Sequence, residues 1–121
     1  MASASSVIEL HLPFPPSANR LWRRSGHTIH KSKTYTDWLR DAGWQVIAQK
    51  AGGIAGPYSL FIQAKRPDKC RRDIDNLIKP INDLLMSVGA VDDDSHCELV
   101  SARWVTTGDG ITVRIERAVT E

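Results

Sequence analysis

Residues 71–89 read RRDIDNLIKPINDLLMSVG, and the spacing of their apolar side chains predicts the element around which the fold is built. Apolar residues recur at helical intervals and share one face, namely Leu77, Ile81, Leu84, Leu85 and Val88. We therefore expect a helix over 76–88, with Asp75 or Asn76 as its N-cap and Gly89 as its C-terminal stop. Pro80 suits only the first turn of such a helix.

The residues before this stretch predict a strand, a loop and another helix. Apolar and polar residues alternate over 7–12, which is typical of a strand, and the prolines that follow end it. Residues 17–31 predict an irregular basic loop with a short strand around 28–30. From Ser32 or Thr34 to Ala51 the apolar spacing becomes helical, and Gly52-Gly53 is expected to stop that helix.

Three further strands complete the predicted fold. The residues of 58–65 suit a sheet and follow Pro57. Strands near 99–106 and 111–118 are expected to form a hairpin across the turn Gly108-Asp-Gly110. The sequence thus predicts a single α+β domain over 1–121, with a mixed sheet of about four strands and two main helices.

Composition sets broad limits on function. No apolar run approaches the ~20 residues that cross a bilayer, and no signal peptide is recognised, so a cytoplasmic protein without a membrane role is expected. Net charge is only +2, yet 11 of the 16 Lys and Arg residues lie in 20–33 and 65–79, and eight of the 14 acidic residues lie in 68–98. Overlapping clusters of this kind suit a protein that binds a polyanion and holds a divalent cation.

Asp73 and Asp75 are the first candidates for that cation site. In an extended segment, residues two apart face the same way, so both carboxylates would point to one side and Ile74 toward the core. Two carboxylates this close favour a hard cation between them. A calcium loop is excluded, because the sixth position from Asp73 is Ile78 and the twelfth is Leu84.

A third carboxylate and a lysine can reach the same place. The predicted helix carries the chain roughly 18–20 Å away, and the extended segment 89–94 can span a similar distance back. The turn Asp92-Asp-Asp94 can therefore close on the pair, while Lys79 lies one turn into the helix. The alternative is structural: Asp75 as a helix cap, Asp73 in solvent and the acidic residues as a polar turn.

The chain resembles the RusA-type Holliday junction resolvases over nearly its whole length. The resemblance is carried by Pro13-Phe-Pro-Pro-Ser-Ala-Asn-Arg20, Arg72-Asp-Ile-Asp-Asn-Leu-Ile-Lys79 and Gly89-Ala-Val-Asp-Asp-Asp-Ser95. It implies a homodimeric, Mg²⁺-dependent endodeoxyribonuclease that places paired nicks in four-way DNA junctions, without an organic cofactor. It assigns catalysis to Asp73, Asp75, Lys79 and Asp94, with the three aspartates as metal ligands and Asp93 as the alternative third ligand. His96-Cys97 departs from the glutamine and aliphatic residue that are frequent there.

One asparagine and five arginines outside the acidic set are candidates for phosphate binding. They are Asn19, Arg20, Arg23 and Arg24 in the first basic segment, and Arg71 and Arg72 beside the acidic pair. Trp22 either stacks on an unpaired base or packs on the core. Two other functional classes stay open: a catalytically silent dimer that binds branched DNA, and a small metal-binding regulatory domain.

Overall fold

A computed structural model describes residues 7–17 and 20–118 of the chain. These residues form an α+β fold with two helices, two short 3-10 turns, a four-stranded mixed sheet and a separate two-stranded sheet. The elements in chain order are β1 (Val7–Leu12), β2 (Trp22–Ser25), β3 (Thr28–Lys31), α1 (Lys33–Gln49), β4 (Tyr58–Lys65), η2 (Ile74–Leu77), α2 (Ile78–Ser87), η3 (Asp94–His96), β5 (Cys97–Val105) and β6 (Ile111–Arg117).

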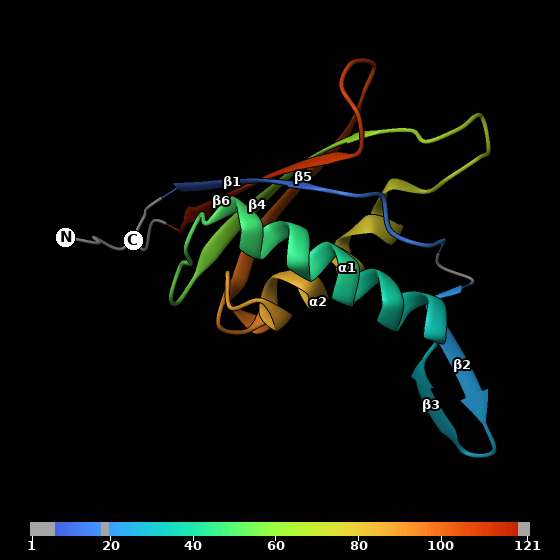
Figure 1. Ribbon diagram of the computed structural model, residues 1–121. Coiled ribbons are helices and arrows are strands. Elements are labelled where there is room, and N and C mark those ends of the chain that lie inside the picture. Colours follow the sequence, from blue (N-terminus) through green and yellow to red (C-terminus); the bar gives the residue numbers. More distant parts are fainter. Residues whose placement is uncertain (1–6, 18–19, 119–121) are drawn as a thin grey trace.

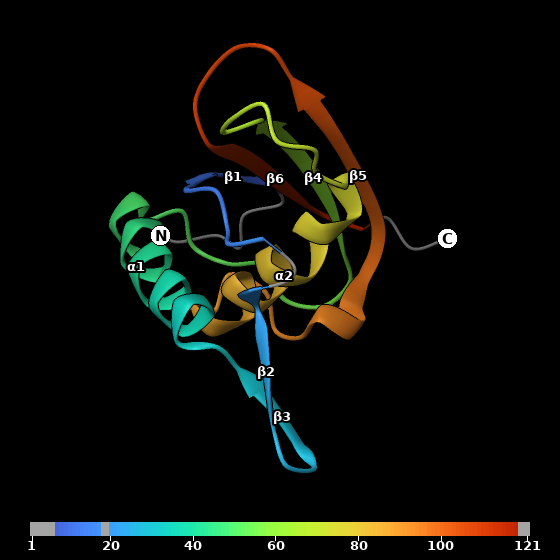
Figure 2. The ribbon, with the colours of Figure 1, turned by 90° about the vertical axis from the view of Figure 1, so that its right-hand side faces the viewer.

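The four-stranded sheet has the order β1-β6-β4-β5, and only β4 and β5 run parallel. β1, β4 and β6 alternate buried and more exposed residues, so each strand turns one apolar face inward. Both helices lie against this inner face (Figures 1 and 2), and the hydrophobic core is the layer between them and the sheet. The molecule therefore has two layers around one core.

The predicted hairpin between the last two strands is wrong. β5 and β6 are joined by a short connection, but β4 lies between them and pairs with both. The chain thus leaves β5 at one edge, passes the end of β4 and enters β6, where Leu12 of β1 faces Ile111. A short glycine-rich connection does not by itself fix which strands pair.

The first basic segment is more regular than the sequence predicted. Only a short strand around 28–30 was expected there, whereas β2 and β3 form an antiparallel hairpin in which Trp22 faces Lys31 and Ser25 faces Thr28. Gly26 supplies the positive φ that this tight turn needs. The hairpin projects from the end of the helical layer (Figures 1 and 2), and every residue of its two strands is exposed.

Both helices lie where the apolar spacing predicted, with different ends. Ser32 caps α1, because its hydroxyl accepts a hydrogen bond from the Tyr35 amide at 3.0 Å. The helix ends before Gly52-Gly53, since Lys50 already adopts a left-handed conformation as its C-cap. Among the described residues, no helix is long and apolar enough to cross a membrane.

Candidate active site

The segment before α2 differs from the extended strand that the sequence predicted. Asp73 is extended, but Ile74–Leu77 forms the 3-10 turn η2, so Asp75 is helical and no N-cap side chain closes the helix. The argument that both carboxylates share one side of a strand therefore fails. Both residues are nevertheless exposed, and their side chains make no hydrogen bond or ion pair with any described residue. Pro80 lies in the first turn of α2, where proline is tolerated.

Lys79 lies between two carboxylates. Its Nζ is 3.0 Å from Oδ1 of Asp83 and 3.2 Å from Oδ2 of Asp94. The hydrogen bond to Asp83 is the main cause that raises the pKa of the Lys79 ammonium above its ordinary value. Lys79 therefore carries a positive charge next to Asp94, as expected from the way the helix and the acidic turn fold back on one another.

Asp83 is a site residue that the sequence analysis missed. It is only 9% exposed, and its second oxygen accepts a hydrogen bond from the Tyr35 phenol of α1. Burial, together with Asp83, raises the pKa of Tyr35 well above its ordinary value, so the phenol keeps its proton and donates. The signal in the sequence was the spacing of Lys79 and Asp83, which places them on neighbouring turns of one helix.

The three consecutive aspartates of the acidic turn have three different partners. Asp92 accepts a hydrogen bond from the Gly56 amide at 3.0 Å, which ties the turn to the chain before β4. Asp93 caps η3 through the Ser95 amide at 3.0 Å, and this hydrogen bond is the main cause that lowers the pKa of Asp93. Only Asp94 contacts Lys79. The turn therefore uses two carboxylates to hold its own shape and presents the third to the lysine.

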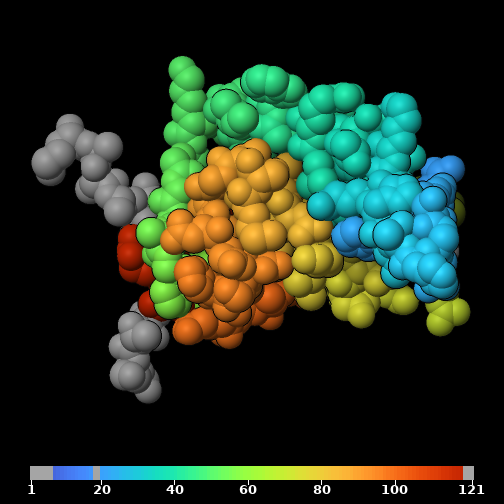
Figure 3. Space-filling view, turned by 90° about the horizontal axis from the view of Figure 1, so that it is seen from below, coloured from blue at the N-terminus to red at the C-terminus, as the bar shows by residue number. Residues whose placement is uncertain are grey.

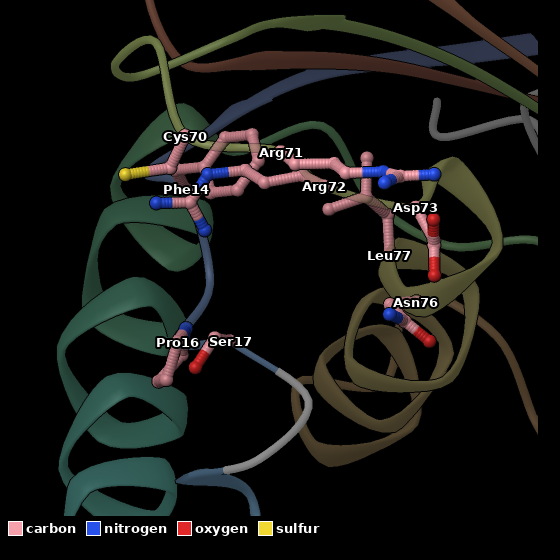
Figure 4. Close-up of a pocket in the computed structure, with 9 residues that line it drawn as sticks. All are labelled: Phe14, Pro16, Ser17, Cys70, Arg71, Arg72, Asp73, Asn76 and Leu77. Atoms are coloured by element: carbon pink, nitrogen blue, oxygen red, sulfur yellow. The ribbon is translucent and has the colours of Figure 1, made fainter.

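A hollow of about 580 Å³ opens beside Asp73. Figure 4 shows Arg71 and Arg72 along one side, Asp73 and Asn76 on another, and the segment with Ser17 across the opening. It is a basic-walled recess with an exposed carboxylate at its margin. Such a recess has the charge and size to receive a phosphate group.

The predicted phosphate-binding residues differ in how free their side chains are. Arg71 is exposed and makes no ion pair with a described residue. Arg72 instead pairs with Asp68 at 2.9 Å and lies over the ring of Phe14, at 5.3 Å from its centroid. Arg72 therefore builds the wall of the recess, while Arg71 is available to a ligand.

The other predicted phosphate contacts belong to the first basic segment. Arg20, Arg23 and Arg24 are all exposed, and Figure 3 shows this segment beside the residues that lead into α2. Asn19 lies outside the described residues. Trp22 is 40% exposed and packs edge-on against Tyr35, with ring centroids 5.8 Å apart. Its ring thus meets the core on one side and solvent on the other.

The donor chemistry of the acidic residues suits Mg²⁺. Among the described parts of the chain, no three His, Cys, Asp or Glu side chains gather closely enough to hold an ion together. Mg²⁺ does not need three, since it is usually bound by one or two carboxylates, waters and substrate phosphates. Asp73 and Asp75 offer exposed oxygen donors without other partners.

Comparison with known proteins places this chain in a family. Residues 13–116 match the model of the endodeoxyribonuclease RusA family. The crossover junction endodeoxyribonuclease RusA of Escherichia coli O139:H28 is 34% identical over 119 residues, 96% of each chain. The protein of that name from Aquifex aeolicus is 31% identical, over 95% of each chain. The one from Enterobacteria phage HK97 is 38% identical, over 70% of this chain and 72% of the relative. This chain belongs to the RusA endodeoxyribonuclease family.

Proposed function

We propose that this protein is a Mg²⁺-dependent endodeoxyribonuclease that resolves four-way DNA junctions, with a role in recombination and repair. Family membership supports an endonuclease that acts on crossover junctions. The observation that carries the proposal is the ion pair between Lys79 of α2 and Asp94. Lys79 lies four residues after Asp75 in the sequence, and both Asp73 and Asp75 have exposed carboxylates. Carboxylates that hold a metal ion and a fixed positive charge both help to stabilise the transition state of phosphodiester hydrolysis.

Each residue of the proposed site has a part that follows from its chemistry. Asp73 and Asp75 would hold Mg²⁺, which when bound activates a water and neutralises charge on the phosphate. Asp94 is paired with Lys79 and is not gathered with them into a three-residue cluster in the described part of the chain. Lys79 places a positive charge where the phosphate or the leaving oxygen becomes more negative. Arg71 binds the neighbouring DNA phosphates and orients the strand in the recess.

We infer that the active form is a homodimer. Paired nicks on two strands of a symmetric junction need two sites, and this chain carries the Asp-x-Asp-Asn pattern once. Two copies related by a twofold axis supply two identical sites in matching orientations.

Incubation of the purified protein with a synthetic four-way junction tests this function. We expect paired symmetric nicks on the junction with Mg²⁺, no nicks after chelation of the metal, and no cutting of a linear duplex of the same sequence. Strand-specific labels report the symmetry of the nicks. A protein that binds the junction yet never cuts it with Mg²⁺ or Mn²⁺ would instead be a silent branched-DNA-binding dimer.

Arg71→Ala is expected to weaken junction binding and to reduce the slope of log K against log salt by about 1, because one phosphate contact is lost. Binding titrations at several salt concentrations measure that slope. Arg40→Ala is the matched control, since Arg40 is an exposed arginine on α1 that pairs with Asp37 and Asp41 outside the recess. An unchanged slope for Arg71→Ala would contradict a phosphate contact at this position.

A further inference from the structure

Asp83 is a buried carboxylate outside the set of residues that the family resemblance assigns to catalysis. Both of its oxygens are used: Oδ1 contacts Lys79 Nζ at 3.0 Å, and Oδ2 accepts the hydrogen bond from Tyr35. A charged group at 9% exposure is costly unless it is paired and hydrogen-bonded. Here the lysine supplies the charge and the phenol supplies the second donor.

Tyr35 cannot easily move away from Asp83. Its side chain is fully buried, and its ring packs against Trp22 and Trp38, with centroid distances of 5.8 and 6.3 Å. The ring is therefore fixed by packing, and the phenol fixes one carboxylate oxygen in turn. A lysine has a flexible four-carbon stem, so the immobile oxygen of Asp83 restrains an ammonium that would otherwise sample many positions.

We propose that Asp83, held by Tyr35, is a positioning residue that fixes the Lys79 ammonium beside Asp94, where it meets the DNA phosphate. This inference rests on the proposed function, because it needs Lys79 to act in cutting. Preorganised charge stabilises a transition state better than a mobile charge, since it does not have to reorganise during the reaction. The contribution of Asp83 is therefore expected in the cutting step and not in binding.

Asn82, the residue before Asp83 on α2, provides a matched comparison, because it also bonds to a buried tyrosine. The Tyr58 phenol donates to Oδ1 of Asn82 at 2.6 Å, and both side chains are buried. Tyr35→Phe and Tyr58→Phe thus each remove one buried hydroxyl that bonds to α2. Of the two tyrosine partners on α2, Asp83 pairs with Lys79, whereas Asn82 has no such contact among the described residues. A purely structural role predicts similar effects for the two variants.

Single-turnover cutting of a four-way junction at saturating protein and Mg²⁺ separates these roles. Asp83→Asn is expected to cut about 10- to 100-fold more slowly, which is the scale for residues that orient a catalytic group through a hydrogen bond. Tyr35→Phe is expected to cut about 2- to 10-fold more slowly, the scale of one hydrogen bond, while Tyr58→Phe cuts at the wild-type rate. Junction binding should not weaken in any of the three, and Tm should be similar in the two phenylalanine variants.

A double-mutant cycle with Lys79→Met identifies the route of the effect. If Asp83 acts through Lys79, Asp83→Asn slows the Lys79→Met protein no further. Three results would each overturn the inference and leave the proposed function standing. They are rate losses of Asp83→Asn and Lys79→Met that multiply in the double variant, an unchanged rate in Asp83→Asn, and equal slowing by Tyr35→Phe and Tyr58→Phe. If Asp83→Asn folds poorly, the comparison of cutting rates between Tyr35→Phe and Tyr58→Phe tests the inference instead. A wild type that never cuts the junction would overturn both the inference and the proposed function.

Discussion

Asp75→Asn is expected to bind a four-way junction at least as tightly as the wild type and to cut it at least about 100-fold more slowly, the effect of losing one preorganised electrostatic group. The amide keeps the shape of the side chain but removes the negative charge that a hard cation prefers. Junction binding is not expected to weaken, because removal of the Asp75 charge lowers the repulsion between the protein and the DNA phosphates. Single-turnover cutting and binding titrations of the same preparation measure both quantities.

The structure makes this variant a clean test. The Asp75 side chain is exposed and makes no hydrogen bond or ion pair with a described residue, so its replacement should leave Tm unchanged. Asp41→Asn is the control, since Asp41 is an exposed carboxylate on α1 that pairs only with Arg40 among the described residues. Retained cutting in Asp75→Asn would remove Asp75 from the proposed site. A lowered Tm with lost binding would give Asp75 a structural role instead.

Local periodicity predicted the helices and most strands because each of these elements buries one face. The helical spacing of Tyr35, Trp38 and Val46 gave α1, and these three side chains are buried in the structure. The alternation in β1 likewise corresponds to buried Ile8, Leu10 and Leu12. Such patterns depend only on neighbours in the chain and on one apolar layer, so they can be read without knowing the partners.

Strand order could not be predicted in the same way. The five residues 106–110 between β5 and β6 can reach about 16 Å, whereas neighbouring strands lie about 4.8 Å apart. The connection is thus long enough to cross one strand spacing or two. The insertion of β4 between β5 and β6 depends on contacts between segments distant in the sequence, and the turn glycines at 108 and 110 carry no information about it.

In the candidate site too, the residues of a local sequence pattern could be predicted, whereas a residue that depends on a distant partner could not. Asp73, Asp75, Lys79 and Asp94 stood out because they are polar residues in a compact pattern. The structure brings Lys79 to Asp94 as expected, but within the described residues the three aspartates do not gather into one cluster. Asp83 was missed because its importance comes from a partner 48 residues away. A buried polar network joins side chains from different elements, and only the packing of α1 on α2 reveals it.

The start of β6, where the chain lies against β1 and β4, leads to a second large effect, this time on stability. Gly110→Ala is expected to lower the free energy of unfolding by about 2–5 kcal/mol, from a left-handed backbone and an overpacked contact together. Gly110 has φ +68°, and a Cβ there would lie 2.7 Å from the Leu12 carbonyl oxygen of β1. Its own carbonyl accepts a hydrogen bond from the Lys65 amide at the end of β4, so the backbone cannot easily retreat.

Gly108→Ala separates the two causes. Gly108 has φ +86°, but a Cβ there would meet nothing within 4 Å, so only the backbone contributes, about 1–2 kcal/mol. Denaturant unfolding of both variants measures the difference. The pairing of β1 with β6 brings Gly110, but not Gly108, against the Leu12 carbonyl. Equal destabilisation would therefore contradict the close approach of Gly110 to the Leu12 carbonyl, which follows from the pairing of β1 with β6.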